Sequence, residues 1–410
     1  MSSALSGLRN HQVMLDVIGN DIANVSTVGF KGSSTVFSDV LTQTLQAGSA
    51  PANGNGGTNV AQVGLGSRLA GTIQSFSQGA IQSTGRSTDG AIQGDGFFVA
   101  RNSSGDMYTR GGAFTLDRDG NLTTAEGNLV QGWQADIAGN VIVQPSNTTN
   151  LQIRVGELLS PSQSKQIDLR GNLSADAAIG ASTTLTLNGY TDQGATTPVN
   201  ITFTKTAANA WTASATYGNP ATSVALTDAN LTFDAAGELL TPADRNVNIA
   251  GGLIPGLPVA ISINLGGANT PGRITQFAGA STAAVVSQDG SASGTLQTFN
   301  VNQQGLIVGS YSNGRSKVIG QLAIAVFANP QGLERVAGGW RQNINSGNPI
   351  VGEAGAGGRG LLSWGSLESS NVDLAEEFAR LIIAQRGFQG NARVVSAADE
   401  VLQEVVNLRR

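Results

Sequence analysis

The C-terminal end of this 410-residue chain decides its fold, because residues 370–408 read SNVDLAEEFARLIIAQRGFQGNARVVSAADEVLQEVVNL. Mostly apolar residues recur there in a strict alternation of three and four positions, which is the spacing of one face of a coiled-coil helix. The pattern predicts a long helix from about Asn371 to Leu408. Ser370 and Asp373 match a capping box, in which two side chains satisfy free backbone amides at a helix start. The seam positions are Leu374, Phe378, Leu381, Gln385, Phe388, Ala392, Val395, Asp399, Leu402 and Val406.

The N-terminus carries a second apolar stripe, with residues at spacings of three, four or seven. Its positions are Leu5, Leu8, Leu15, Ile18, Ile22 and Val25. We expect this helix to pair with the C-terminal helix as a coiled coil. Five further apolar residues of the C-terminal helix lie outside its seam, on faces that one partner helix cannot cover. They are Ile382, Ile383, Val394, Val401 and Val405. We therefore expect both ends to be disordered in the monomer and to fold against neighbouring copies.

Between the two ends, short alternating runs are separated by Gly, Asn and Asp, which is typical of β-hairpins. Residues 97–101 and 107–117 are predicted strands joined by a turn over 102–106. Thr-rich strands follow at 182–187 and 199–205, and Asn188-Gly189 between them is a hairpin signal. The earlier hairpin style resumes after residue 290, so the Thr-rich region is interpreted as a domain inserted into the first β domain.

These patterns predict a multidomain, mainly β protein with terminal α-helices that pair as a coiled coil, from which nested β domains project outward. The expected division has four parts. They are a terminal helical coiled-coil domain (1–28 plus 370–410), a linker or extended region (29–72), an inner β domain (73–146 plus 291–369) and an inserted outer β domain (147–290).

Composition excludes several classes of function. The 23 Lys+Arg and 28 Asp+Glu give a net charge of −5 without a basic cluster, so nucleic-acid binding is not expected. With no Cys and one His, thiolate metal sites and His-based nucleophilic catalysis lack their residues. The most apolar run, residues 318–328, has about half of the ~20 residues that a membrane helix needs. We expect no enzyme activity, no cofactor, no membrane insertion and no cleaved signal peptide.

Several local motifs favour structural interpretations. Residues 355–360 match G-x-G-x-x-G but lack the flanking strand and helix of a phosphate cradle, so they are interpreted as a turn. Residues 117–121 resemble the start of a calcium loop, but the twelfth position is Asn128 rather than Glu, which favours a hairpin turn. His11 lacks a partner ligand, so we expect a solvated or interface role. The charges of four residues are expected on solvated or channel-facing helical surface: Lys31, Arg380, Arg386 and Arg393.

Motifs from one end of the chain to the other resemble the bacterial flagellar rod and hook proteins. At the N-terminus the resemblance rests on DIANVSTVGFK at residues 21–31. At the C-terminus it rests on LESSNVDLAEEF at 367–378 and QRGFQGNAR at 385–393. GDGFF at 94–98 and YTRGGAFTL at 108–116 are similar to the family's shared β domain. The family-motif residues are Ala23, Asn24, Val25, Gly29, Phe30, Lys31, Ser370, Asn371, Val372, Asp373 and Leu374.

Strands at 203–211 and 231–239 resemble the outer domain of the hook members of that family. The resemblance implies a structural subunit that polymerises into a flexible hollow helical tube, a universal joint that transmits torque from the rod to the filament. It implies an extracellular location, export by the flagellar export apparatus, and contacts with the rod, the hook–filament junction proteins and the hook cap.

Two alternatives stay open. The first is a distal rod subunit of the same family, against which the inserted domain argues. The second is a secreted β-rich adhesin in which Trp211, Tyr190 and Tyr217 form a sugar-stacking face, although the same aromatic residues fit a strand core.

Overall fold

The computed structural model describes residues 2–48, 50–51, 56–145, 147–218, 220–255, 260–266 and 273–407. It divides into two compact units. The first unit comprises residues 1–154, 299–308 and 318–410, and the second comprises 155–298 and 309–317. The second unit is therefore inserted into the first in chain order.

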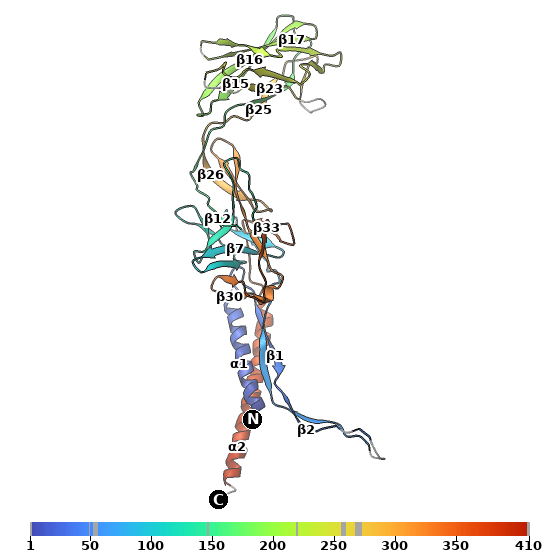
Figure 1. The fold of residues 1–410 in the computed structure, drawn as a ribbon, viewed down its shortest axis with the longest axis vertical. Helices are drawn as coiled ribbons and strands as arrows, with labels where there is room; N and C mark the ends of the chain where they lie inside the picture. Colours follow the sequence, from blue (N-terminus) through green and yellow to red (C-terminus); the bar gives the residue numbers. More distant parts are fainter. Residues whose placement is uncertain are drawn as a thin grey trace. The chain divides into compact units, whose positions relative to one another are not determined.

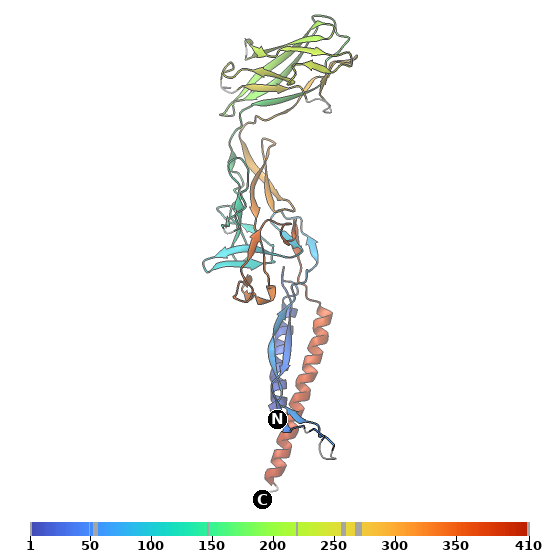
Figure 2. The ribbon, with the colours of Figure 1, turned by 45° about the vertical axis from the view of Figure 1, so that its right-hand side comes forward.

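The two terminal helices, α1 (Ser2–Ala23) and α2 (Leu374–Asn407), lie side by side in the first unit (Figures 1 and 2). They are antiparallel, because Gly7 lies against Asn391 whereas His11 lies against Gly387. This confirms the predicted pairing in a mainly β protein. In both views α2 continues past the start of α1. Since Gly7 lies against Asn391, Ser2 is level with about residue 396, and the rest of α2 up to Asn407 makes about three turns. The expected last residue of the helix, Leu408, lies outside the described residues.

The start of α2 differs from the prediction, since the helix begins at Leu374 rather than near Asn371. Asp373 is the capping residue, because its Oδ1 accepts the amide of Ala375 at 2.8 Å and that of Glu376 at 3.3 Å. Asn371 is drawn away from the helix by tertiary hydrogen bonds. Its Oδ1 accepts the Gly32 amide at 2.9 Å, and its Nδ2 donates to the Ser75 carbonyl at 2.8 Å.

Two antiparallel hairpins follow α1 in the region 29–72, which the sequence predicts as a linker or extended stretch. β1 pairs with β4, and β2 pairs with β3. β1 and β4 lie along α1 (Figure 1). These strands are β1 (Ser33–Asp39), β2 (Thr42–Gln46), β3 (Ala61–Gly64) and β4 (Ser67–Gln74).

Antiparallel strands form the β part of the first unit, in which β28, β11, β7, β8, β31 and β30 are successive neighbours. Two short ladders, β5–β34 and β6–β33, join residues near both ends of the chain. The remaining elements of this unit are β5 (Ile81–Ser83), β6 (Gly90–Gln93), β7 (Phe97–Asn102), β8 (Gly105–Thr109), β9 (Thr115–Leu116), β10 (Leu122–Thr123), β11 (Leu129–Gln134), β12 (Thr149–Asn150), β29 (Ile324–Val326), η1 (Pro330–Gly332), β30 (Glu334–Val336), β31 (Gly339–Arg341), β32 (Ile350–Gly352), β33 (Leu361–Trp364) and β34 (Ser366–Glu368). Three strands carry the chain across the division between units: β26 (Gly294–Val301), β27 (Leu306–Tyr311) and β28 (Ser316–Leu322).

An aromatic cluster forms much of the core of the first unit. The Phe97 ring lies 5.6 Å from Phe76, 5.4 Å from Trp340 and 6.0 Å from Phe327. Tyr108 packs edge-on against Phe327 at 4.7 Å. Such contacts stabilise beyond their buried area, so the strands around Phe97 are a rigid base for the segments that connect to the helices.

The second unit consists of two sheets around one apolar core, which is the arrangement of a β-sandwich. One sheet has the order β19-β22-β23-β14-β24 with β25 on β14, and the other has β15-β16-β17-β20-β21 with β18 on β17. The strands of the two sheets are β14 (Gln166–Asn172), β15 (Ser182–Tyr190), β16 (Thr196–Ala207), β17 (Ala210–Tyr217), β18 (Thr222–Val224), β19 (Leu226–Thr227), β20 (Asn230–Phe233), β21 (Leu239–Thr241), β22 (Asn246–Ile249), β23 (Ile261–Asn264), β24 (Ile274–Thr275) and β25 (Ala284–Gln288). The short strand β13 (Leu158–Leu159) pairs with β26 instead.

Side chains alternate between core and surface along the Thr-rich strands, as the sequence predicts. Trp211 is only 1% exposed in the core between the sheets, and Tyr190 and Tyr217 are partly buried. This places Trp211 where a sugar could not stack on it, so the strand-core interpretation of this residue is confirmed.

The predicted hairpin turn at Asn188-Gly189 is wrong, because β15 runs through both residues and pairs them with Pro198 and Thr197. The chain turns later, over Thr191–Ala195. Gly194 has a φ of +82° there, and its amide donates to the Thr191 carbonyl at 3.0 Å. A glycine in the left-handed region closes this turn at low cost.

The two motifs set aside in the sequence are turns. Residues 117–121 join β9 and β10, with Asp117 Oδ1 accepting the amides of Asp119 and Asn121. Residues 355–360 connect β32 to β33, and Gly355, Gly357 and Gly358 all have positive φ.

Candidate assembly site

A buried cluster of charges joins the two ends of the chain in the first unit. Lys31 Nζ lies 2.7 Å from Glu368 Oε1, and both side chains are fully buried. Arg110 Nη1 lies 3.4 Å from the other carboxylate oxygen. Lys31 also donates to the Ser77 carbonyl at 2.7 Å, and Glu368 Oε1 accepts the Gly79 amide at 2.9 Å. These partners replace the water that buried charges lose.

Burial sets the electrostatics of this cluster. It lowers the pKa values of Lys31 and of Arg110, because desolvation disfavours a charged base, while Glu368 partly restores both. One carboxylate therefore holds two cations. Removing Glu368 would leave two buried positive charges without a counter-ion.

The expectation that Lys31 lies on solvated or channel-facing helical surface is wrong. Lys31 lies after the loop that follows α1, and its partner Glu368 is the second residue of the C-terminal motif at 367–378. Each of the two terminal motifs carries a charge close to its β-domain end, Lys31 in one and Glu368 in the other. The opposite charges of Lys31 and Glu368, one in each motif, were the feature of the sequence from which this ion pair could have been predicted.

The structure brings several residues of the two family motifs together. Gly29 donates its amide to the Glu368 carbonyl at 2.8 Å and has a φ of +68°. A Cβ atom at Gly29 would lie 2.5 Å from the Arg110 carbonyl carbon, so only glycine fits. Asn371 bonds the Gly32 amide, as described above. Ser370 Oγ accepts the Val372 amide at 3.3 Å.

The other motif residues have more local roles. Asn24 Nδ2 donates to the Asn20 carbonyl at 2.9 Å, and Asn24 Oδ1 accepts from Thr27. Ala23 and Leu374 are exposed, whereas Val25 and Val372 are partly buried. Phe30 is buried, with the Arg335 guanidinium 4.2 Å from its ring centre.

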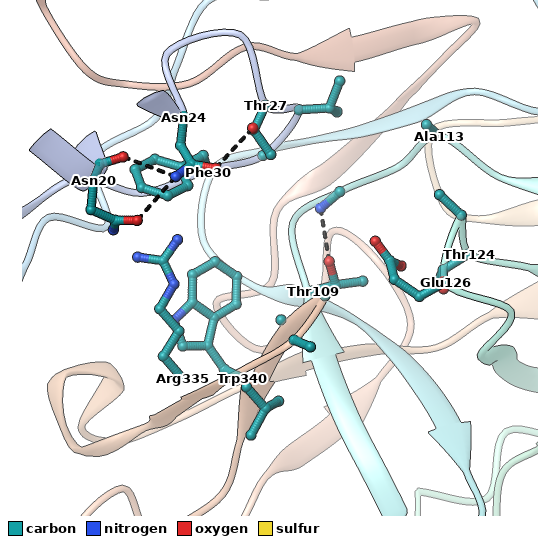
Figure 3. Close-up of a pocket in the computed structure, with 18 residues that line it drawn as sticks. Asn20, Asn24, Thr27, Phe30, Thr109, Ala113, Thr124, Glu126, Arg335 and Trp340 are labelled. Carbon is teal, nitrogen blue, oxygen red and sulfur yellow. Dashed lines mark hydrogen bonds between the residues drawn. The ribbon is translucent and has the colours of Figure 1, made fainter. Parts of the chain in front are cut away.

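A cavity of about 670 Å³ lies beside Phe30 (Figure 3). The loop after α1, the end of β8, and the hairpin of β30 and β31 line it, with Arg335 and Trp340 on one side and Glu126 on another. Within the described ranges, no group of His, Cys, Asp and Glu residues is arranged to hold a metal ion.

Small and polar side chains, rather than large apolar ones, mark the contact between α1 and α2. Gly7 lies so close to Asn391 that a Cβ atom would come within 2.7 Å of its Nδ2. A Cβ at Gly387 would overlap the His11 ring, and Ala384 is fully buried. Glycine and alanine at these positions let the helix backbones approach closely. His11 thus lies at the contact between the helices.

Much of the predicted seam is not covered within the chain. Phe378 is 51% exposed and Val406 is 69% exposed. Leu5, Leu374, Phe388 and Leu402 are also exposed, Ile18 is buried, and Leu8, Leu15, Ile22, Val25, Leu381 and Val395 are partly buried. The five apolar residues outside the seam are exposed as well: Ile382, Ile383, Val394, Val401 and Val405. An apolar surface this extensive is unusual for a protein that stays monomeric.

Among the described residues, no helix has the length and apolar content to cross a membrane.

Four family descriptions match successive parts of the chain. They are Flagella basal body rod protein (residues 1–31), Flagellar hook protein FlgE/F/G D1 domain (91–157), Flagellar basal body protein FlaE D2 domain (169–291) and Flagellar basal body rod FlgEFG protein C-terminal (365–408). Both helices, residues 91–157 and most of the inserted unit thus have counterparts.

Full-length relatives are similar across the same span. The flagellar hook protein FlgE of Treponema pallidum is 36% identical, covering 100% of this chain and 99% of the relative. FlgE of Escherichia coli is 35% identical with the same coverage of both chains. The crystal structure of Helicobacter pylori flagellar hook protein FlgE2 is 14% identical with a TM-score of 0.52, over 70% of this chain and 99% of that one. This last likeness concerns the fold alone.

Proposed function

Since the chain belongs to the flagellar hook protein FlgE family and is a non-enzymatic structural subunit of the hook, we propose that its copies build a hollow, bendable tube that passes torque from rod to filament. Family membership implies self-polymerisation within the flagellum and an extracellular location. The hollow bore, the bending and the torque are the parts that we add.

The observation that carries this proposal is the uncovered apolar surface of α2. The α1–α2 contact uses Gly7, Gly387 and Ala384, so it leaves Phe378 and Phe388 exposed. The last turns of α2 extend past α1, and Val406 there is more exposed than any other apolar residue of the described helices. Burying each such side chain against another copy would contribute about 1.5–3 kcal/mol.

Contacts of this kind join unlike surfaces of neighbouring copies. Such head-to-tail contacts produce an open helix when the rotation between copies does not close a ring. We propose that the seam and family-motif residues of α1 and α2 form the inner wall of this helix, and that the β domains face outward. The four-part domain division and the folding of both ends on assembly remain predictions.

We also propose the partners that follow from this position. The tube would join the rod at one end and the hook–filament junction proteins at the other, with a hook cap at the growing tip. The subunit would leave the cell through the flagellar export apparatus without a cleaved signal peptide. A low charge content and the absence of Cys make an unfolded chain compatible with a narrow channel.

Electron microscopy of concentrated purified protein tests the proposal. We expect curved tubes, whereas straight short rods would favour a rod subunit and single particles would favour the adhesin. A chain that lacks residues 397–407, or carries Leu402→Glu with Val406→Glu, should remain folded but form no tubes. Ile137→Glu, which changes a residue that is 94% exposed in a turn, is the matched control. Normal polymerisation by the truncated chain would contradict the proposal.

A further inference from the structure

An acidic cavity of about 530 Å³ lies beside the first turns of α2 in the first unit. Asp21 of α1 lines it together with the capping residue Asp373 and with Glu376, Glu377 and Arg380 of α2. Ser75, Ser77 and the amide side chain of Asn371 are also part of its wall. The charged residues of the wall are therefore four acids and one base.

Two of these carboxylates are buried with an oxygen that has no hydrogen-bond partner among the described residues. Asp21 is 1% exposed, and its Oδ2 accepts the Ser33 amide at 2.8 Å while Oδ1 accepts nothing. Glu377 is also buried, and its Oε1 accepts from Arg380 at 3.1 Å while Oε2 accepts nothing. Buried polar atoms are almost always paired, so both oxygens indicate a missing donor.

The base within the cavity does not balance its acids. Arg380 also bonds Glu376, so one guanidinium is shared by two glutamates. Burial raises the pKa of Asp21 and that of Glu377, and Arg380 offsets this only in part. Arg335 of β30 lowers the pKa of Asp21 more than Arg380 does, and Asp21 and Glu376 both raise the pKa of Glu377, so the net shift of both carboxyls is still upward. A further cation would stabilise both buried carboxylates.

Unpaired cations stand on the same helix. Arg386 and Arg393 are exposed, and neither forms an ion pair or hydrogen bond within the described part of the chain. They follow Glu377 by about 14 Å and 24 Å along the helix axis, at 1.5 Å per residue. They cannot reach the acidic cavity of their own chain, because a straight helix keeps them apart.

We propose that the acidic cavity at Asp21 and Glu377 accepts the guanidinium of Arg386 or Arg393 from α2 of a second copy. This rests on the proposed polymerisation. The two arginines and the acidic cavity lie at different positions along the axis of α2. If a second copy lies parallel to the first and is shifted along this axis, its arginines come level with the cavity of the first copy. The copy at one end of such a row then has an unoccupied cavity, and the copy at the other end has unpaired arginines. Further copies can therefore add at both ends, and the row does not close on itself. A planar guanidinium with several N–H donors can serve two carboxylates at once.

Reversing the charges of Arg386 and Arg393 tests their part of the contact and leaves the residues of the acidic cavity unchanged. We expect Arg386→Glu with Arg393→Glu to raise the protein concentration needed for polymerisation by at least about tenfold. Thermal unfolding of the monomer should not change, because both residues are exposed and unpaired. Arg9→Glu is the matched control, since Arg9 is exposed and unpaired on α1 within the described residues, and it should polymerise as the wild type does.

Crosslinking tests the contact itself, and the chain has no Cys to interfere. One chain would carry Glu376→Cys and the other Arg386→Cys or Arg393→Cys. After copolymerisation, a short bis-maleimide should join the two kinds of chain, and only in polymers. Glu376→Cys mixed with Arg9→Cys is the control that should give no dimer.

The possible results separate the two proposals. If the reversed arginines leave polymerisation unchanged, or well-formed polymers give no crosslink at either arginine, the contact is overturned and the proposed function stands. If the wild-type chain forms no polymer under any condition, the proposed function fails and the contact fails with it.

Discussion

Lys31 and Glu368 are 337 positions apart in the sequence, yet they form a fully buried ion pair at 2.7 Å. The pair fixes the loop that leaves α1 to the strand that leads into α2. This pair is one of the links that attach the terminal helices to the β part of their unit, beside the Gly29–Glu368 backbone bond and the bonds of Asn371.

Replacing Lys31 tests how much this attachment contributes. Lys31→Met should lower the free energy of unfolding by about 3–5 kcal/mol, because it leaves Glu368 with the more distant Arg110. Urea denaturation gives the value. Arg118→Met, in an exposed turn, is the control and should change stability by less than about 0.5 kcal/mol. An effect of Lys31→Met as small as that of the control would contradict the role of the pair.

Gly29 is expected to tolerate no side chain. Gly29→Ala combines a left-handed backbone with the overlap at Arg110, so it should cost more than the roughly 1–2 kcal/mol of backbone strain alone. Gly85→Ala isolates that strain, because Gly85 has a φ of +69° but no neighbouring atom within 4 Å of the place where the new methyl group would lie. Thermal unfolding of both variants should show the larger loss at Gly29, and equal losses would refute the close contact.

Two glycines of α2 should respond to alanine in opposite directions. Gly390 has open space around it, so Gly390→Ala should stabilise the helix by about 1 kcal/mol. Gly387→Ala should lose that gain and destabilise the α1–α2 pair, because its methyl group meets the His11 ring. Helical circular dichroism during heating distinguishes them. A gain at both positions would show that the helices are not in close contact.

Asp21→Asn should change stability in a pH-dependent way. Burial raises the pKa of Asp21 above 3.8, so the folded chain binds the proton more tightly than the unfolded chain. The stability of the wild type therefore falls as the pH rises through the window from 3.8 to the raised value. Asparagine keeps the acceptor for Ser33 and carries no charge. The variant should melt at a higher temperature than wild type near neutral pH, and lose this advantage below pH 3.8.

The same variant should weaken polymerisation, because the cavity loses a negative charge. A variant that only folded poorly would lose both monomer stability and assembly. A more stable monomer that polymerises less well would therefore show that the Asp21 charge acts in the contact between copies. An equal stability difference at both pH values would contradict the titration of Asp21.

Local sequence patterns predicted most of the architecture. Three-and-four spacing is a property of neighbouring residues, so the C-terminal helix followed from Leu374, Phe378 and the seam after them. The N-terminal helix followed from its own stripe, which starts at Leu5. Alternation of apolar and polar residues likewise identified the strands around Phe97 and Phe203.

Features that depend on distant partners were not predictable in this way. Asn371 leaves the helix start because Gly32 and Ser75 hold its side chain. Lys31 is buried because Glu368 lies beside it. Asn188-Gly189 remains a strand because a competing turn follows at Gly194. The covered face of α2 was also missed, since Gly387 and Ala384 contact α1 while apolar seam residues such as Phe378 stay exposed.

The charge pair also sets an order of events for a chain that is delivered from its N-terminus. Lys31 is delivered early, and 337 positions separate it from its partner Glu368. A contact between such remote positions forms late in folding, because the intervening loop must first be closed. The junction between helices and strands can therefore close only after residue 368 has been delivered.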